Sequence, residues 1–235
     1  MGPVTDRTVT LALDGHAVEL AVRRSRRARN IALRIDPAKP LPELVLPQRV
    51  GEAEGLDFAR SRTRWLLDRL AALPPRVPFR PGATLPLRGE PHLIAHDPAA
   101  RAGVWREPGR IVVSGRAEHL SRRLQDWLRR EARVAIAPQV RSKATQLGRK
   151  PGRISVRNQN SRWGSCAANG NLSFNWRLIL APEFVLDYVV AHEVGHLAVP
   201  NHSDAFWRTV DALTPHATEG RAWLRENGDR LFRYG

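Results

Sequence analysis

Residues 192–196, which read His-Glu-Val-Gly-His, carry the residue pattern most able to do chemistry. His192 and His196 are four residues apart, and on a helix that spacing places both side chains on one face. Two imidazoles on one face can ligate a single zinc ion, and the adjacent Glu193 can reach a zinc-activated water as general base. The pattern therefore predicts a zinc site with His192 and His196 as ligands and Glu193 as the catalytic residue.

His202 is the expected third ligand, because a catalytic zinc ion takes three protein ligands and keeps one position for water. Pro200 disfavours the helical conformation at Val199, so the helix that begins near Pro182 should end near Ala198. The chain can then turn back, and the imidazole of His202 can approach the metal from a loop.

The spacing of these three histidines equals that of the metzincin proteases, which place a glycine midway and a methionine turn below the metal. Val199 occupies the glycine position here, and the chain has no methionine after Met1. A methionine turn is therefore impossible, which excludes the metzincin class.

Composition limits the remaining function classes. The single cysteine, Cys166, excludes an intramolecular disulfide and a cysteine-based zinc cage, and it favours a reducing, cytoplasmic setting. No run of about 18 apolar residues predicts a membrane span, and Met1 to Gly15 lacks the apolar core of a signal peptide. The formal charge is +15, but 35 of the 38 basic residues are arginines spread along the chain. This charge favours an acidic partner, with nucleic acid as a candidate.

The elements that must position these residues can be read from periodicity and turn residues. Asp14-Gly15 and Asn169-Gly170 each indicate a tight hairpin turn. We expect the strands before residue 50 to form a small antiparallel sheet. The predicted strands lie at residues 8–22, 31–35, 44–46, 83–116, 154–156, 161–166 and 171–177. The predicted helices lie at residues 50–73, 118–147, 182–198, 204–213 and 216–227.

With these motifs in view, the chain resembles the YgjP-like metallopeptidases, a family related to the SprT-like zincins. The resemblance covers most of the chain and implies one zinc ion held by His192, His196 and His202, with Glu193 catalytic. The chain departs from the family at residues 198–200, Ala-Val-Pro, where polar residues are more usual. The stretches that carry the resemblance are Arg24–Arg29, Ser161–Cys166, Asn171–Leu180, His192–His196, Asn201–Ser203 and Phe206-Trp207.

We therefore expect an α+β fold with a zincin-like metallopeptidase core and an N-terminal β-rich region. Residues 1–117 would form the β-rich accessory region and residues 118–235 the catalytic core. No flexible linker separates the two regions, so we expect them to form one compact unit.

The expected activity is that of a zinc metallopeptidase acting on peptide or protein substrates. In many zincins an edge strand above the metal pairs with the extended substrate, and the hairpin before the active helix would supply that strand. The candidate substrate-binding residues are Arg162, Trp163, Gly164, Ser165 and Arg177, with the two arginines as candidates for holding the oxyanion or the substrate.

Two alternatives remain open at this stage. The same zinc-activated water could attack phosphorus, which would make the protein a hydrolase of nucleotides or phosphoanhydrides; abundant arginine suits such substrates. The SprT-like resemblance and the +15 charge also suit a protease recruited to DNA. The natural substrate and the oligomeric state are left open by the sequence.

Overall fold

The computed structural model describes residues 7–235, so the first six residues of the predicted N-terminal region lie outside the described part. The chain divides into two compact units, one ending at Pro74 and the other beginning at Pro75. In both units a run of strands is followed by helices, and this segregated order of strands and helices confirms the α+β class. Between residues 7 and 235, no helix is both long and apolar enough to cross a membrane.

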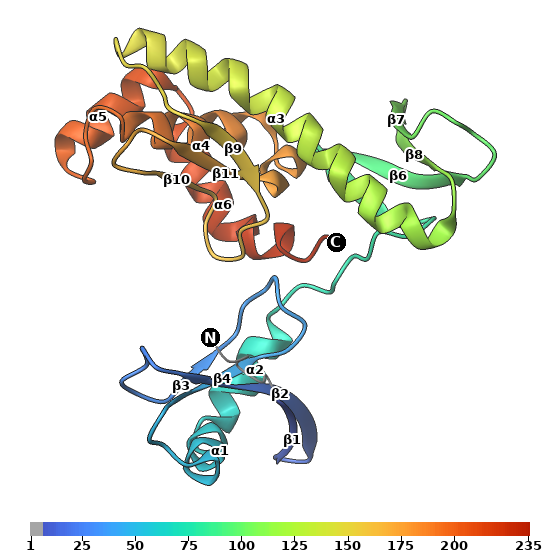
Figure 1. The fold of residues 1–235 in the computed structure, drawn as a ribbon, viewed down its shortest axis with the longest axis vertical. Helices are drawn as coiled ribbons and strands as arrows, with labels where there is room; N and C mark the ends of the chain where they lie inside the picture. Colours follow the sequence, from blue (N-terminus) through green and yellow to red (C-terminus); the bar gives the residue numbers. More distant parts are fainter. Residues whose placement is uncertain (1–6) are drawn as a thin grey trace. The chain divides into compact units, whose positions relative to one another are not determined.

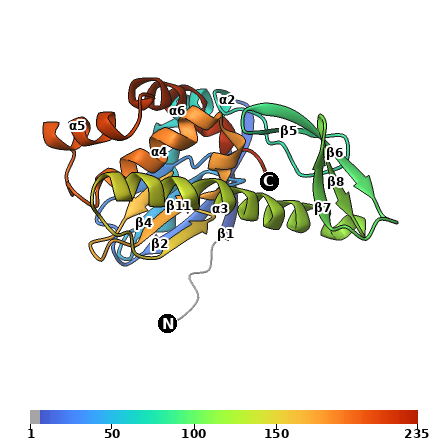
Figure 2. The ribbon, with the colours of Figure 1, turned by 90° about the horizontal axis from the view of Figure 1, so that it is seen from above.

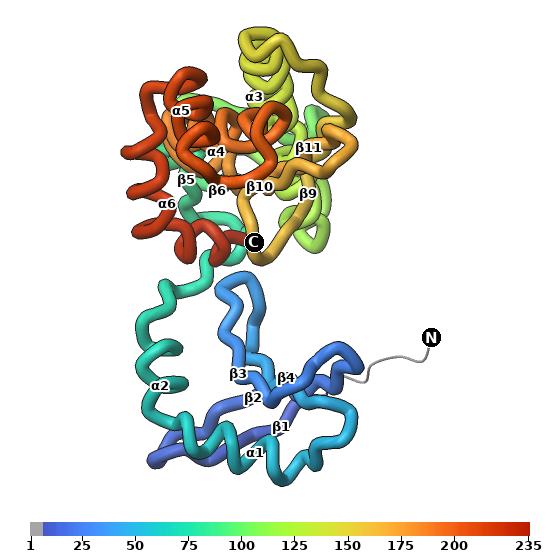
Figure 3. The backbone as a smooth tube through the Cα atoms, turned by 90° about the vertical axis from the view of Figure 1, so that its left-hand side faces the viewer, coloured from blue at the N-terminus to red at the C-terminus, as the bar shows by residue number. Residues whose placement is uncertain are grey.

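The first unit contains a four-stranded sheet in the order β1-β2-β4-β3 (Figure 3). Asp14 and Gly15 take positive φ angles of 46° and 82°, and this turn confirms the predicted β1–β2 hairpin. The expectation of a purely antiparallel sheet is wrong, because β4 lies between β2 and β3 and runs parallel to β2. The strands are β1 (Arg7–Leu13), β2 (His16–Ser25), β3 (Ala32–Arg34) and β4 (Glu43–Pro47).

Two helices, α1 (Glu52–Ser61) and α2 (Thr63–Ala71), replace the single helical segment expected over residues 50–73. The chain leaves the helical conformation at Arg62, where φ is −111° and ψ is 18°. Ala59 of α1 and Leu66 of α2 are buried against the apolar side of the sheet. The first unit therefore has a hydrophobic core of its own.

The second unit opens with another four-stranded sheet, in the order β5-β6-β8-β7, which packs on the long helix α3 (Leu120–Gln146). A short 3₁₀ helix, η1 (Ala117–His119), leads into α3. The expected boundary between residues 117 and 118 falls inside this unit. The strands are β5 (Thr84–Leu87), β6 (Glu90–Asp97), β7 (Val104–Glu107) and β8 (Arg110–Ser114).

A three-stranded sheet in the order β10-β11-β9 lies against α3 and against α4, the helix that contains His192 (Figures 1 and 2). The turn at Asn169-Gly170 confirms the predicted hairpin, with a φ of 76° at Gly170. Trp176 was expected on the return strand but begins a 3₁₀ helix, because the Asn175 side chain accepts a hydrogen bond from the Arg177 backbone N–H at 3.1 Å. The elements are β9 (Ile154–Arg157), β10 (Gly164–Cys166), β11 (Leu172–Asn175), η2 (Trp176–Leu180), α4 (Glu183–Gly195), α5 (Asp204–Leu213) and α6 (Ala217–Leu231).

The helix α4 is buried between these elements and is anchored by a polar contact as well as by packing. The ammonium of Lys143 on α3 lies 2.7 Å from the Asp187 carboxylate of α4 and donates to the Leu213 carbonyl at 2.6 Å. Thr214 donates to the same carboxylate. Because an unpaired charge here would be costly, this network fixes α4 relative to α3 and α5.

Candidate metal centre

Three histidines converge at the C-terminal end of α4. Each histidine contributes one ring nitrogen to the cluster, and these three nitrogens lie within 4.8 Å of one another. His192 and His196 come from α4 and its last turn, and His202 comes from the loop before α5. The Nε2 atoms of His192 and His202 are 3.2 Å apart. The structure therefore brings together the three ligands expected from the sequence.

The end of α4 orients His196. The helix stops at Gly195, slightly before the expected Ala198, and the backbone N–H of Val199 still bonds to the Gly195 carbonyl at 3.0 Å. That turn brings the Val199 carbonyl 3.1 Å from Nδ1 of His196, which donates to it. With the proton on Nδ1, the lone pair of Nε2 is available for a metal ion.

Phe206 of α5 forms the apolar floor beneath the histidines. Its ring stacks on His196 with centroids 4.4 Å apart and meets His192 edge-on at 4.9 Å. Gly195 makes this contact possible, because a Cβ at that position would lie 3.2 Å from the Phe206 ring. A fully buried aromatic ring thus supports two of the three histidines.

Electrostatics favour neutral imidazoles in this cluster. Burial lowers the pKa of His192 to about 4, with further lowering by the charges of His196, His202 and Arg221. Burial also lowers the pKa of His196, and the hydrogen bond to Val199 opposes that effect. Because only the neutral ring has a free lone pair, the lowered pKa values of His192 and His196 favour the metal-binding form of these two rings at neutral pH.

The donor set fits a divalent zinc ion. Two nitrogens bonded to one tetrahedral zinc at about 2.1 Å would lie roughly 3.4 Å apart, close to the observed 3.2 Å between His192 and His202. Two ring nitrogens that face each other so closely compete for one proton, and a shared cation removes that conflict. Nδ1 of His192 is buried and has no hydrogen-bond partner among residues 7–235.

Glu193 lies beside the histidines and faces the sheet. Its side chain is buried, and burial raises its pKa to about 7, while the charge of Arg162 lowers it. The carboxylate approaches Gly164 on β10 so closely that a Cβ there would lie 2.5 Å from both Cγ and Oε1 of Glu193. The strand and the carboxylate are thus in direct contact across the site.

A cavity of about 690 Å³ opens over the cluster and joins it to the β10 strand. His192, Glu193 and His202 line one side, and Gly164 and Ser165 line the other. The sheet order leaves β10 at an edge, paired only with β11 among the described strands. An unpaired strand beside a metal-binding cluster offers backbone donors and acceptors to an extended ligand.

The register shows which backbone groups point away from β11. Trp163 O accepts from Asn175 N at 2.8 Å, and Ala167 N donates to Asn171 O at 2.9 Å, so these residues face inward. In an antiparallel ladder inward and outward residues alternate. The N–H and C=O groups of Gly164 and Cys166 therefore point toward the free edge.

The other predicted substrate-binding residues lie elsewhere. Arg162 is exposed next to β10, outside the cavity lining. Trp163 stacks on Phe232 with centroids 4.5 Å apart. Arg177 is only 5% exposed, lies over the Trp176 ring at 4.6 Å, and donates to Asn158 at 2.6 Å. The structure places Arg177 in the packing behind the sheet and not in the cavity.

The sequence did not reveal what two residues of the site contact. Phe206 was noted only as part of a family-like stretch, yet it packs directly on His192 and His196. Gly164 was noted as a substrate-binding residue, but its closest contact is Glu193. The glycine of the hairpin next to the His-Glu pair is the sequence signal for this contact, once the hairpin register is known.

This arrangement of an α+β fold, a helix-borne histidine pair and a third histidine from the next loop defines a metallopeptidase-like domain. Residues 29–227 match the model of the YgjP-like family, described as its metallopeptidase domain, and the chain belongs to that family. No curated protein matches the chain. Among solved structures, the metallopeptidase zymogen of Pyrococcus abyssi abylysin is similar, with 21% identity and a TM-score of 0.35 over 38% of this chain and 93% of that one.

Proposed function

We propose that this protein is a zinc-dependent metallopeptidase in which His192, His196 and His202 hold one zinc ion and Glu193 is the general base. The observation that carries the proposal is the convergence of three imidazoles beside a buried carboxylate in one open cavity. A zinc ion bound there supplies Lewis acidity, which polarises a carbonyl and makes water nucleophilic at neutral pH.

Glu193 has the position and the environment for proton transfer. Its carboxylate faces the cavity, and its raised pKa of about 7 lies near the operating pH that favours acid–base exchange. The carboxylate can accept a proton from the attacking water and then deliver it to the leaving amine of the cleaved peptide. Contact with Gly164 restricts where the carboxylate can lie during both steps.

The free edge of β10 is the proposed binding site for the peptide backbone. An extended substrate would add a strand there and pair with the outward N–H and C=O groups of Gly164 and Cys166. Because Gly164 also contacts Glu193, a peptide paired at this residue lies next to the general base. Ser165 lines the cavity, and we propose the exposed Arg162, which precedes the strand, as a flanking contact to the substrate.

All residues of this proposal lie within residues 118–235, which we propose as the catalytic core, with residues 1–117 as an accessory region. Protein substrates follow from the family, and the unpaired Cys166 suits a reducing, cytoplasmic setting.

The decisive experiment compares wild type with Glu193→Gln and with Glu226→Gln, an exposed carboxylate on α6. Zinc content is measured by elemental analysis, and cleavage is measured on a mixed peptide library and on nucleoside triphosphates. We expect one zinc ion per chain in all three proteins, peptide cleavage by wild type and Glu226→Gln, and none by Glu193→Gln. Equal peptide cleavage by Glu193→Gln, or phosphate release without peptide cleavage, would overturn the proposal.

A further inference from the structure

A second cavity, of about 610 Å³, lies where the sheet of β5 to β8 meets the start of α3. Four arginines line it, Arg101, Arg122, Arg123 and Arg130, against one carboxylate, Asp126. No residue lines both this cavity and the one over the histidines. Nothing in the proposed peptidase chemistry uses this concentration of positive charge.

One of the four guanidinium groups is held in place by the fold. Arg123 donates to the Ser114 carbonyl at 2.7 Å and to its hydroxyl at 3.4 Å. The group lies against the backbone of Gly115, where a Cβ would come within 2.6 Å of Nη1. Gly115 also takes a φ of 82°, which favours glycine. Because Gly115 has no Cβ and can adopt this positive φ, the Arg123 guanidinium can lie against its backbone in the lining of the cavity.

The remaining charges are poorly compensated. Asp126 is shared, since it lies 3.6 Å from Arg122 and 3.8 Å from Arg129. The side chains of Arg101 and Arg130 are exposed and have no hydrogen-bond or ion-pair partner among residues 7–235. Two guanidinium groups at the cavity are therefore available for an anion.

The position of Arg122 and Arg123 works against helix stability. Both lie in the first turn of α3, a helix of 27 residues with no acidic residue in that turn. The N-terminal end of a helix carries partial positive charge, which favours anions and disfavours cations. An anion bound between these arginines would offset the partial positive charge of the helix N-terminus and accept hydrogen bonds from the guanidinium groups.

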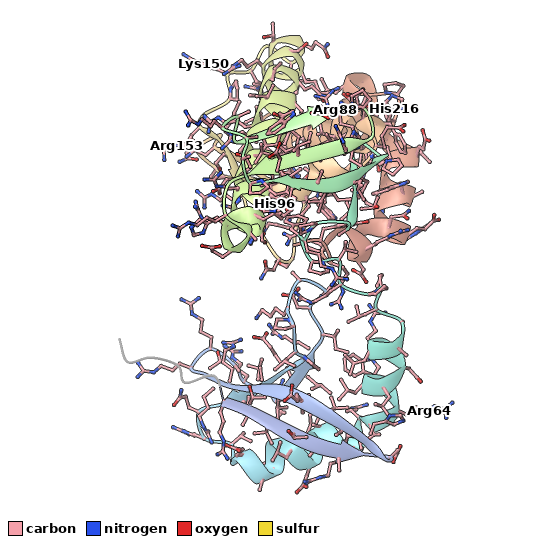
Figure 4. The ribbon with its side chains drawn as sticks, turned by 90° about the vertical axis from the view of Figure 1, so that its right-hand side faces the viewer. Arg64, Arg88, His96, Lys150, Arg153 and His216 are labelled. Atoms are coloured by element: carbon pink, nitrogen blue, oxygen red, sulfur yellow. The ribbon has the colours of Figure 1, made fainter. Side chains whose placement is uncertain are left out.

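We propose that this cavity is a binding site for a phosphate group, separate from the metal centre and independent of the peptidase function. One guanidinium group can donate to two oxygens of a phosphate at once. The cavity offers one anchored guanidinium, that of Arg123, and two unpartnered ones, those of Arg101 and Arg130. The phosphate belongs either to a small ion or ester or to a nucleic-acid backbone. Figure 4 shows Lys150 and Arg153, two further basic side chains of this unit, projecting outward from it.

The test uses the full ¹⁵N-labelled chain titrated with inorganic phosphate at constant ionic strength, so that general screening stays equal. The amide signals of Gly103 and Gly115, which line the cavity, report binding. The double variant Arg101→Gln/Arg130→Gln, the cavity variant, removes the two unpartnered guanidinium groups. The matched control, Arg133→Gln/Arg141→Gln, removes two exposed arginines of α3 outside the cavity and changes the net charge equally.

We expect saturable shifts at Gly103 and Gly115, weakened at least tenfold in the cavity variant and less than twofold in the control. A labelled single-stranded oligonucleotide, followed by fluorescence anisotropy, then separates the two sources of phosphate. Oligonucleotide binding that is lost only in the cavity variant identifies a nucleic-acid backbone, and unchanged oligonucleotide binding identifies a small phosphate ligand. Absence of saturable shifts with phosphate, or equal weakening in both variants, would overturn the proposal.

Discussion

Gly164 and Glu193 lie so close together that a Cβ at residue 164 would displace the Glu193 side chain. A Cβ there would be 2.5 Å from Oε1 and 2.7 Å from Cδ of the carboxyl group. Gly164 belongs to β10 and Glu193 to α4, and the strand β11 and the 3₁₀ helix η2 lie between these two elements in the sequence. The glycine therefore lets the β10 strand and the Glu193 carboxylate pack in direct contact.

Substituting Gly164 with alanine should displace the Glu193 carboxylate and reduce turnover. Because general-base catalysis contributes about 10²- to 10⁴-fold, we expect kcat to fall at least roughly tenfold. The atoms nearest to a Cβ at residue 164 all belong to Glu193 and none to the three histidines. The zinc content of the variant should therefore equal that of wild type. The measurement is kcat on a cleaved peptide together with elemental analysis. Gly51→Ala is the control, because a Cβ at Gly51 meets nothing within 4 Å; equal kcat in both variants would contradict the contact.

The outward N–H of Cys166 gives a second prediction. Cys166→Pro removes that N–H, and proline is tolerated on an edge strand when the missing donor faces away from the sheet. We expect kcat/KM for peptides to fall about tenfold relative to Cys166→Ala, which keeps the N–H. The comparison isolates the backbone group from the thiol. If both variants cleave equally well, the substrate does not pair with this edge.

The chemistry-bearing residues were predictable because their spacing along the chain is local. His192 and His196 share a face through helix geometry alone. Pro200 predicts that the helix ends before His202, and α4 does end before it, at Gly195. The hairpins at Asp14-Gly15 and Asn169-Gly170 follow from the same kind of short-range signal. Short-range sequence rules therefore predict the histidine cluster and both turns.

Contacts between distant segments were not predictable in this way. Arg177 looks like an exposed strand arginine in the sequence, yet the Asn175 cap turns the chain and places it against Trp176. The parallel pairing of β2 with β4 depends on where β3 is inserted, which no turn residue encodes. Gly164 opposite Glu193 likewise needs the packing of the sheet on α4.

Metal binding should stabilise the protein through the three histidines. A ligand that binds only the folded state at 100 times its Kd adds about 2.7 kcal/mol, so zinc should raise Tm. His202 is exposed on its loop, so His202→Ala should leave the metal-free Tm nearly unchanged while weakening zinc affinity at least about tenfold. Differential scanning calorimetry with and without zinc measures both quantities. His119→Ala, a histidine of η1 outside the cluster, should behave as wild type.

The raised pKa of Glu193 predicts a pH effect on the metal-free protein. Between pH about 7 and 4.5 the folded state holds a proton on Glu193 that the unfolded state has released, so acidification through this range stabilises the fold. The lowered pKa of His192, about 4, acts in the opposite direction between pH 6.5 and 4. Glu193→Gln removes only the first effect.

Metal-free Glu193→Gln should therefore lose stability relative to wild type as the pH falls from 7 to 4.5. The difference in slope should approach about 1.4 kcal/mol per pH unit for one proton. Urea unfolding at several pH values measures it. Glu226→Gln should run parallel to wild type, and a Glu193→Gln curve parallel to wild type would show that Glu193 titrates normally.

Arg177 should contribute to stability and not to substrate binding. Its guanidinium lies between the Trp176 and Phe232 rings, donates to Asn158 at 2.6 Å, and donates to the Tyr234 carbonyl at 3.2 Å. Lysine cannot reproduce this planar fork, so Arg177→Lys should lower the free energy of unfolding by about 2 kcal/mol. Below the melting transition, KM should stay within about twofold of wild type because Arg177 does not reach the cavity.

The control is Arg162→Lys. Because Arg162 is exposed next to β10, this change should leave the free energy of unfolding within about 0.5 kcal/mol of wild type. A raised KM with unchanged stability in Arg177→Lys would instead place this residue at the substrate.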